Sequence, residues 1–283
     1  MRICFWGKIA DALLGRTYGG GELQIALLAK ALANLGHEVV VVDLDIEEGF
    51  VTGEGIKVYP VKGYNKGMKV FRTLTHRLPA LYTVFLEVNA DVYYCRIREY
   101  RHIIVYMAAR KLKAKFVLAL ASNLDILSIR KRWKHFYSSN VKDLWGVFNG
   151  FMGEIVYPYL LRNADLVLVQ HEGQRDILLK KGIASTVFYN LIDESSLKCI
   201  NEADSDKAFV YVGSLDKRKG FEVFFEIVEK TPHHRFKVIG KVRDKTGIRL
   251  YQQLGNFKNV QLMGKLSHAD TINEISRSKA LIS

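Results

Sequence analysis

Short apolar runs alternate with amphipathic segments along the chain. Residues 3–6 predict a first strand, and a loop over residues 7–18 leads to three glycines. The next segment carries apolar residues at i, i+3, i+4, i+7 and i+10, which predicts a helix with one buried face: Ile25, Leu28, Ala29, Leu32 and Leu35. Gly36 is expected to end this helix. Four valines, 39–42, then predict a strand buried on both faces, so this region is a β-α-β unit.

The same alternation continues to the end of the sequence. Further strands are predicted over residues 91–95, 115–121, 166–170 and 185–189. A second series comprises strands 208–212, 236–239, 260–263 and 280–282 with helices 221–230 and 269–278. Because helices and short apolar strands alternate, the class is α/β with parallel sheets. The polar stretch between the two series predicts domains at residues 1–193 and 206–283 joined by a linker at 194–205.

Composition and charge narrow the class of protein. The chain has 283 residues and a net charge of +13, and residues 62–142 alone hold 17 Lys/Arg against 4 Asp/Glu. Such a basic region suits anionic lipid, nucleic acid or phosphorylated substrates, but no nucleic-acid recognition motif supports that partner. The three cysteines lie far apart and predict buried thiols instead of a disulfide framework or zinc site. We see no leader and no apolar run long enough to span a bilayer, so we expect a cytoplasmic protein.

Two glycine loops are candidate phosphate sites. Glycines 19–21 precede a helix, whose free N–H groups and dipole favour an anion. Gln24 stands where a dinucleotide fingerprint would need its last glycine, and a turn that requires glycine is the alternative. The second loop, 213–220, places Lys217, Arg218 and Lys219 before a helix, where an anion would offset their charge. The alternative there is a solvated run of charges.

Five segments in order resemble the large retaining glycosyltransferase family of GT-B fold. They are the Gly-Gly-x-Glu loop, helix and GHEV strand of residues 20–39, the segment 163–183, the sequence YNLID at 189–193, the loop VGSLDKRKG, and residues 260–283. YNLID keeps Asn190 and Asp193 of a longer family motif. The resemblance implies two Rossmann-like domains facing a cleft, with a nucleotide diphosphate-sugar held mainly by the second and the acceptor by the first.

The resemblance also implies roles for particular residues. Gly20 and Gly21 would approach the donor phosphate or sugar. Gly213, Ser214 and Lys219 would lie at the diphosphate, and Lys219 would stabilise the charge on the departing group. The residues expected near the nucleotide base are Gly240, Lys241, Lys265 and Leu266. The donor would be of UDP or GDP type, and no metal or other cofactor is expected.

Two departures from the family pattern affect the expected site. Ser214 replaces an arginine of the donor loop, so Lys217 or Arg218 would have to supply that charge. Asn123 and Asp125 occupy a region where many members carry a histidine. Asn123 could bind a sugar hydroxyl and Asp125 could orient an acceptor. Turn chemistry is the alternative for both, because Asn and Asp are common in loops after strands.

The leading hypothesis is therefore transfer of a hexose, with retention, from a nucleotide diphosphate-sugar to a glycan or lipid-linked acceptor. The alternative is a non-catalytic GT-B module that binds a nucleotide or a partner. The resemblance also implies a further helix with two glutamates beyond Ser283, so we expect a truncated chain that is a poor transferase by itself.

Peripheral association with the inner face of the membrane is a further expectation. Residues 66–78 predict a helix with one apolar and one polar face. Val70, Phe71, Leu74 and Leu78 share the apolar face, and Lys66, Lys69, Thr73 and His76 lie largely opposite. Residues 129–137 mix cations with aromatics, which also suits a headgroup layer. In the alternative, the apolar stripe joins the core.

Overall fold

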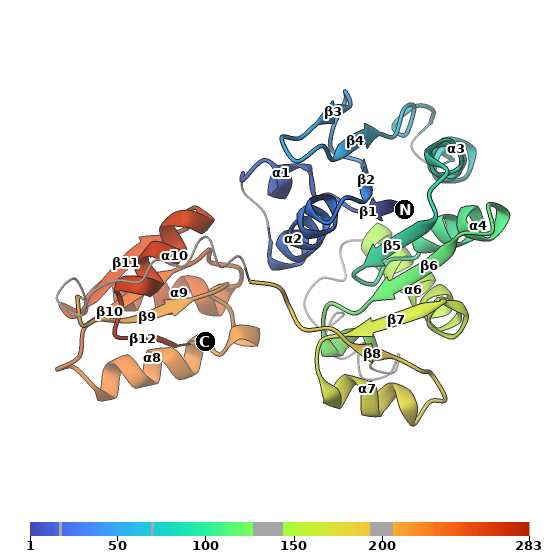
Figure 1. Ribbon diagram of the computed structural model, residues 1–283. Helices are drawn as coiled ribbons and strands as arrows, with labels where there is room; N and C mark the ends of the chain where they lie inside the picture. The colour runs from blue at the N-terminus through green and yellow to red at the C-terminus, as the bar shows by residue number, and fades with distance from the viewer. Residues whose placement is uncertain (17–18, 69–70, 127–143, 193–205, 283) are drawn as a thin grey trace. The chain divides into compact units, whose positions relative to one another are not determined.

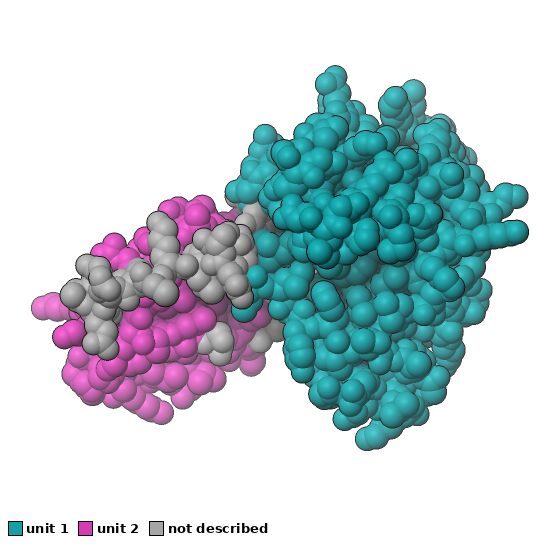
Figure 2. Space-filling model, in the orientation of Figure 1, with its two compact units in different colours: residues 1–192 teal, residues 193–283 magenta. Residues whose placement is uncertain are grey.

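The chain forms two compact units, residues 1–192 and 193–283 (Figure 2). The computed structural model describes residues 1–16, 19–68, 71–126, 144–192 and 206–282. The predicted linker 194–205, the basic aromatic segment 129–137, Lys69, Val70 and Asp193 lie outside the described residues. Within the described ranges, no helix is both long and apolar enough to cross a bilayer.

Unit 1 is built on an eight-stranded sheet in the order β3-β4-β2-β1-β5-β6-β7-β8 (Figure 1). All neighbouring strands pair in parallel except β3 and β4. The strands are β1 Arg2–Trp6, β2 Glu38–Asp43, β3 Phe50–Val51, β4 Lys57–Pro60, β5 Val92–Arg96, β6 Lys115–Ala119, β7 Leu166–Val169 and β8 Thr186–Val187. The strands β2, β3 and β4 lie on one side of β1, and β5 to β8 lie on the other side. The strand order therefore reverses at the boundary between β1 and β5.

Helices cover both faces of this sheet. Successive side chains of a strand point to opposite faces, so both faces are apolar and each packs against its own helices. Cys4 and Trp6 of β1 face the helices α3 Leu78–Val88, α4 His102–Lys111 and α6 Leu144–Asn163. Ile3 and Phe5 face α1 Ala10–Leu13 and α2 Gly20–Asn34. A further helix, α7 Glu172–Leu179, lies between β7 and β8 in the sequence. The strands predicted at 3–6, 39–42, 91–95, 115–121 and 166–170 are present, and the valines of β2 are buried as predicted. The strand predicted at 185–189 is reduced to the two residues of β8, neither of which is buried.

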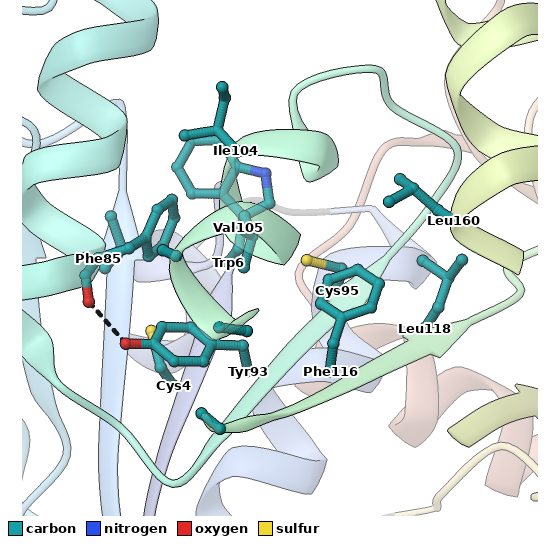
Figure 3. Packing of buried hydrophobic residues seen from close by; sticks show 14 of the residues in the cluster. Cys4, Trp6, Phe85, Tyr93, Cys95, Ile104, Val105, Phe116, Leu118 and Leu160 are labelled. Carbon is teal, nitrogen blue, oxygen red and sulfur yellow. Dashed lines mark hydrogen bonds between the residues drawn. The ribbon is translucent and has the colours of Figure 1, made fainter. Parts of the chain in front are cut away.

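The core beneath α3 and α4 is aromatic and closely packed. Figure 3 shows Trp6 beside Phe85, with ring centroids 5.5 Å apart, and Tyr93, whose hydroxyl donates to the Phe85 carbonyl at 2.6 Å. Cys4 and Cys95 lie in the same core as free thiols, and burial raises the pKa of both. The expected buried thiols are therefore present at these two positions, while Cys199 lies outside the described residues.

Unit 2 is a four-stranded parallel sheet in the order β11-β10-β9-β12. Its strands are β9 Phe209–Val212, β10 Phe236–Ile239, β11 Val260–Gly264 and β12 Ala280–Ile282, and its helices are α8 Phe221–Lys230, α9 Lys245–Leu254 and α10 His268–Arg277. Buried rings and aliphatic side chains from β9 and the loop after it, β10, α8 and α9 form one core: Tyr211, Leu215, Phe221, Phe224, Val228, Phe236, Val238, Leu250 and Leu254.

The structure corrects several local predictions. The loop over 7–18 contains α1, and the elements β3, β4 and α9 were not predicted because they are short or weakly apolar. Leu35 follows the end of α2 and is 74% exposed, so it does not join the buried face. Nor do residues 66–78 form the predicted continuous helix, because a π-helical turn at Thr73–Arg77 leads into α3, which carries a proline in its first turn.

Exposure along this segment also differs from the prediction. Thr73, expected on the polar face, is buried, whereas Phe71 and Leu74 are 60% and 72% exposed. Leu78 is partly buried against the core. The apolar stripe of the segment therefore divides between the core and the surface.

Candidate functional site

Glycines end three neighbouring strands of unit 2. Gly213 follows β9, Gly240 follows β10, and Gly264 is the last residue of β11. The N–H of Gly240 donates to Gly264 at 2.7 Å, and a Cβ at Gly240 would overlap the carbonyl oxygen of Gly213. Open α/β sheets bind ligands at the carboxyl ends of their strands, and glycine allows a ligand to approach the backbone closely. This edge of unit 2 is therefore a candidate ligand site.

Three lysines accompany these glycines. Lys219, Lys241 and Lys265 follow the same three strands, and the side chains of all three are exposed. In the described part of the chain, no carboxylate forms an ion pair with any of them. Ser214 and Leu266 are half-buried in the same loops. The residues of unit 2 that were expected at the donor thus lie along one sheet edge, and the unneutralised charge of this edge suits a diphosphate.

Side chains fix the backbone of the Lys219 loop. Buried Asp216 accepts a hydrogen bond from the Lys219 N–H at 2.9 Å, and the Tyr211 hydroxyl donates to the Lys219 carbonyl at 3.0 Å. Gly220 follows at φ 72°, a conformation that favours glycine. Lys217 differs because its ammonium lies 3.8 Å from the Glu222 carboxylate. The loop therefore holds Lys219 in place with its ammonium free for a ligand.

The first glycine loop begins α2 in unit 1. Gly19 precedes the helix, Gly20 and Gly21 are its first two residues, and no described side chain caps it. A Cβ at Gly21 would lie 3.2 Å from Ile97 Cδ1. Ile97 has φ 73°, which is strained for a β-branched residue and is the kind of outlier that concentrates at functional sites.

A cavity of about 150 Å³ opens beside this loop. It lies at the carboxyl ends of β1 and β5, the place where the strand order reverses and open α/β sheets bind ligands. Its lining comes from the ends of β1 and β5 and the segments that follow them, from α2, and from the residue after β2: Trp6, Gly7, Lys8, Ile9, Glu22, Ile25, Leu44, Arg96, Ile97, Glu99, Arg101 and His102. Unit 1 therefore has a site of its own.

Most charges at this cavity have partners. Lys8 pairs with Asp45 at 2.9 Å, and Arg101 pairs with Glu99. Burial raises the pKa of Glu99, an effect that Arg101 opposes. Burial, with a smaller contribution from Arg101, lowers the pKa of His102 to about 3, so its imidazole is neutral at physiological pH.

The YNLID segment lies against the same edge of unit 1. Asn190 accepts a hydrogen bond from Arg96 Nη2 at 3.0 Å. Gln24 forms two hydrogen bonds with the backbone of Leu191, donating at 2.9 Å and accepting at 2.7 Å. Gln24, which replaces the glycine of a dinucleotide motif, therefore holds this segment in place.

Asn123 and Asp125 have structural partners at the end of β6. The Asp125 carboxylate accepts hydrogen bonds from the N–H groups of Ala121 at 2.8 Å and Ser122 at 2.9 Å. The Asn123 side-chain oxygen accepts one from Gln174 at 3.0 Å. These contacts agree with the turn-chemistry alternative, while the predicted roles toward an acceptor stay predictions.

Sequence reasoning missed the charged residues of the cavity and Asp43. Buried Asp43 accepts hydrogen bonds from the N–H groups of Ile9 and Ala10 at 2.7 and 2.8 Å, which fixes the chain after β1. For the charged residues of the cavity between 96 and 102, the available signal was the density of charges at the end of a buried strand. Only the sheet order shows that this segment meets the loop after β1.

Comparison with known proteins identifies similar chains. Residues 19–189, more than half of the chain, match the model of the glycosyl transferase 4-like domain. A Klebsiella pneumoniae protein described as an uncharacterized 42.6 kDa protein in the cps region is 23% identical over 275 residues, which cover 87% of this chain and 70% of that protein.

Solved structures share the fold at low sequence identity. A glycosyltransferase from Rickettsia africae has a TM-score of 0.60 and 20% identity, and the match covers 100% of this chain and 72% of that one. A mutant of the S. aureus protein TarM, in complex with fondaparinux, α-GlcNAc-glycerol and UDP, has a TM-score of 0.68 and 11% identity, covering 99% and 80%. The predicted GT-B fold class is thereby confirmed.

Proposed function

The chain belongs to the glycosyl transferase 4-like family, and from that premise we propose that it transfers a hexose from a nucleotide diphosphate-sugar to a glycan or lipid-linked acceptor with retention. Glycosyl transfer itself follows from the family. The hexose, the retention, the donor of UDP or GDP type and the acceptor class belong to the proposal. The complex of TarM with UDP favours a uridine nucleotide among the donors to be tested.

The observation that carries the proposal is the carboxyl edge of the unit 2 sheet. There, Lys219, Lys241 and Lys265 are exposed beside glycine-ended strands. A diphosphate bound at this edge would receive charge-assisted hydrogen bonds from Lys219 and contacts from the glycine backbone, with Lys241 and Lys265 toward the nucleotide base. Gly213 and Ser214 belong to the diphosphate end in this proposal, and Leu266 belongs to the base end. Gly20 and Gly21, in unit 1, are proposed to approach the donor phosphate or sugar.

In the proposed reaction, the bond between the sugar C1 and the diphosphate oxygen breaks while a bond from C1 to an acceptor hydroxyl oxygen forms. The proton of that hydroxyl leaves with the diphosphate. Negative charge grows on the departing diphosphate, and Lys219 is proposed to stabilise it in the transition state. The lysines supply the positive charge, so the proposal includes no metal ion or other cofactor.

Calorimetry and a turnover assay test this proposal together. The full chain is titrated with UDP, GDP and their glucose, N-acetylglucosamine and mannose derivatives, and released nucleotide is measured with a glycan acceptor. Binding of one nucleotide class with transfer to the acceptor supports the proposal, and proton NMR of the product gives its anomeric configuration. An inverted product would refute retention, and the absence of binding by every nucleotide would refute the donor proposal. Ser214 in place of the family arginine favours the alternative, a non-catalytic nucleotide-binding module.

We further propose that unit 1 associates with the anionic inner face of the membrane. Met68, Phe71 and Leu74 are 72%, 60% and 72% exposed, in a segment that also carries exposed Lys62 and Lys66. Apolar side chains with neighbouring cations suit the headgroup layer of an anionic bilayer, where each well-placed cation contributes about 1 kcal/mol. Co-sedimentation with vesicles of phosphatidylglycerol, but not with neutral vesicles, is the expected result.

A further inference from the structure

Arg96 is a buried cation at the cavity of unit 1. It is the last residue of β5, is 7% exposed, and lines the cavity at the point where the strand order reverses. One nitrogen, Nη2, donates to the amide oxygen of Asn190 at 3.0 Å. The Nε atom is buried and has no hydrogen-bond partner among the residues that the structure describes.

No carboxylate neutralises this guanidinium within the described residues. The other two cations of the cavity are already in ion pairs, Lys8 with Asp45 and Arg101 with Glu99. The amide oxygen of Asn190 orients Arg96 but carries no net charge. A buried charge without a counter-ion is costly, and an anion in the cavity would supply both a counter-ion and an acceptor for the Nε–H.

Glu22 is the opposing group. It is the third residue of α2, lines the same cavity, and forms no ion pair within the described part of the chain. Because Glu22 lies in the first turn of α2, its negative charge interacts favourably with the positive end of the helix dipole. It would repel an anion bound at Arg96, while its oxygens could accept hydrogen bonds from sugar hydroxyls.

We propose that this cavity binds an acidic group of the acceptor, either the carboxylate of a uronic acid or a phosphate ester, with Arg96 as its counter-ion. The inference rests on the proposed function, because it names the class of acceptor that the transferase takes. Arg96 is then a specificity-determining residue that favours acidic over neutral acceptors. Glu22 limits the affinity for the acid and receives hydroxyl groups of the same sugar.

The donor diphosphate is the competing occupant of the cavity. The proposed donor site in unit 2 already has Lys219, Lys241 and Lys265, whereas unit 1 has its own cavity and its own unneutralised cation. An acidic acceptor and the donor diphosphate predict different nucleotide binding by a variant that lacks Arg96. If Arg96 serves the acceptor, its replacement leaves the binding of UDP and GDP unchanged.

The experiment uses the full chain and three probes: glucuronate, glucose 6-phosphate and glucose. Titrations are followed by the indole N–H signal of Trp6, which lines the cavity, in proton–nitrogen NMR spectra. At least one of the two acidic probes should shift this signal with a Kd at least about ten-fold below that of glucose, and the stronger of the two identifies the acid. Equal binding of all three probes, or no shift with either acid, would overturn the proposal.

Three variants test the assignment. Arg96→Gln should weaken the binding of the acidic probe about ten-fold or more. Arg162→Gln removes an exposed charge from the same unit and should change it less than about two-fold. Glu22→Gln should tighten it about two- to five-fold, a gain that misfolding cannot produce. Weakening by Glu22→Gln, or equal effects of the two arginine variants, would contradict the model.

Calorimetry with UDP and GDP separates the two proposals. Unchanged nucleotide binding by Arg96→Gln shows that Arg96 does not serve the donor, and thermal unfolding of the variant shows whether unit 1 is folded. A loss of nucleotide binding as large as the loss of acid binding would assign Arg96 to the donor diphosphate and overturn the inference. If neither nucleotide binds the native chain, the donor proposal fails while the acidic probes still report on the cavity.

Discussion

Replacing Lys219 with alanine should weaken nucleotide binding far more than replacing Lys217. The two lysines are two residues apart in one loop, but among the residues that the structure describes only Lys217 has a carboxylate near its ammonium, Glu222 at 3.8 Å. The backbone of Lys219 is fixed by Asp216 and Tyr211 through main-chain atoms that alanine retains. The substitution should therefore remove the charge and leave the loop in place.

The expected magnitudes follow from the contacts. A charge-assisted hydrogen bond to phosphate contributes about 1.5–3 kcal/mol, so Lys219→Ala should raise the Kd for UDP or GDP by about 10- to 150-fold. Lys217→Ala removes an exposed charge that is partly offset by Glu222, and about a two-fold rise in Kd is expected.

Isothermal titration calorimetry of both variants and the native chain with UDP and GDP, at one low salt concentration, makes the comparison. Thermal unfolding of each variant serves as the control for folding. Equal losses from the two substitutions would refute the reasoning, because they would show that the loop acts as a diffuse cationic field.

The exposed segment before α3, buried His102 and the glycine after β10 each give a further prediction. Phe71→Ser with Leu74→Ser should reduce sedimentation with phosphatidylglycerol vesicles, whereas Leu35→Ser, equally exposed elsewhere, should not; equal losses would contradict the membrane proposal. The pKa of buried His102 is lowered to about 3 from 6.5, so protonation favours the unfolded state, and its contribution to stability is present above pH 6.5 and lost as pH falls toward 3. Between pH 7.5 and 5.5, urea denaturation should show a loss of about 1.4 kcal/mol in the native chain that His102→Gln lacks, and equal losses would refute this. Gly240→Ala should destabilise the protein by about 2–4 kcal/mol, since its Cβ meets the Gly213 carbonyl, and unchanged thermal stability would refute that clash.

The architecture was predictable where the apolar pattern is strong. The four valines of β2 are buried on both faces as predicted, and α8 Phe221–Lys230 and β10 Phe236–Ile239 occupy the predicted ranges. The pattern failed near α3, because periodicity alone does not show that a π-helical turn precedes a proline-started helix. Sequence spacing predicted one continuous apolar face there, whereas packing partly buries Leu78 and leaves Phe71 and Leu74 exposed.

Of the two candidate sites, the unit 2 edge could be predicted from the sequence and the unit 1 cavity could not. Glycines and lysines at strand ends are local signals, so the residues of the unit 2 edge could be named from sequence. The cavity of unit 1 depends on strand order, which places Arg96 of β5 beside the loop after β1, about 90 residues earlier in the chain. Asp43 has a similar explanation, since its hydrogen bonds to Ile9 and Ala10 form only when β1 and β2 pair.

Hydrogen–deuterium exchange with and without UDP or GDP tests the central claim most directly. The account predicts that the nucleotide class that binds slows exchange in peptides covering residues 213–220, 240–243 and 264–267, which follow β9, β10 and β11. Lys219→Ala should reduce this protection at the same nucleotide concentration. Unchanged exchange at all three segments with both nucleotides, or protection confined to unit 1, would contradict the assignment of the donor site to the unit 2 edge.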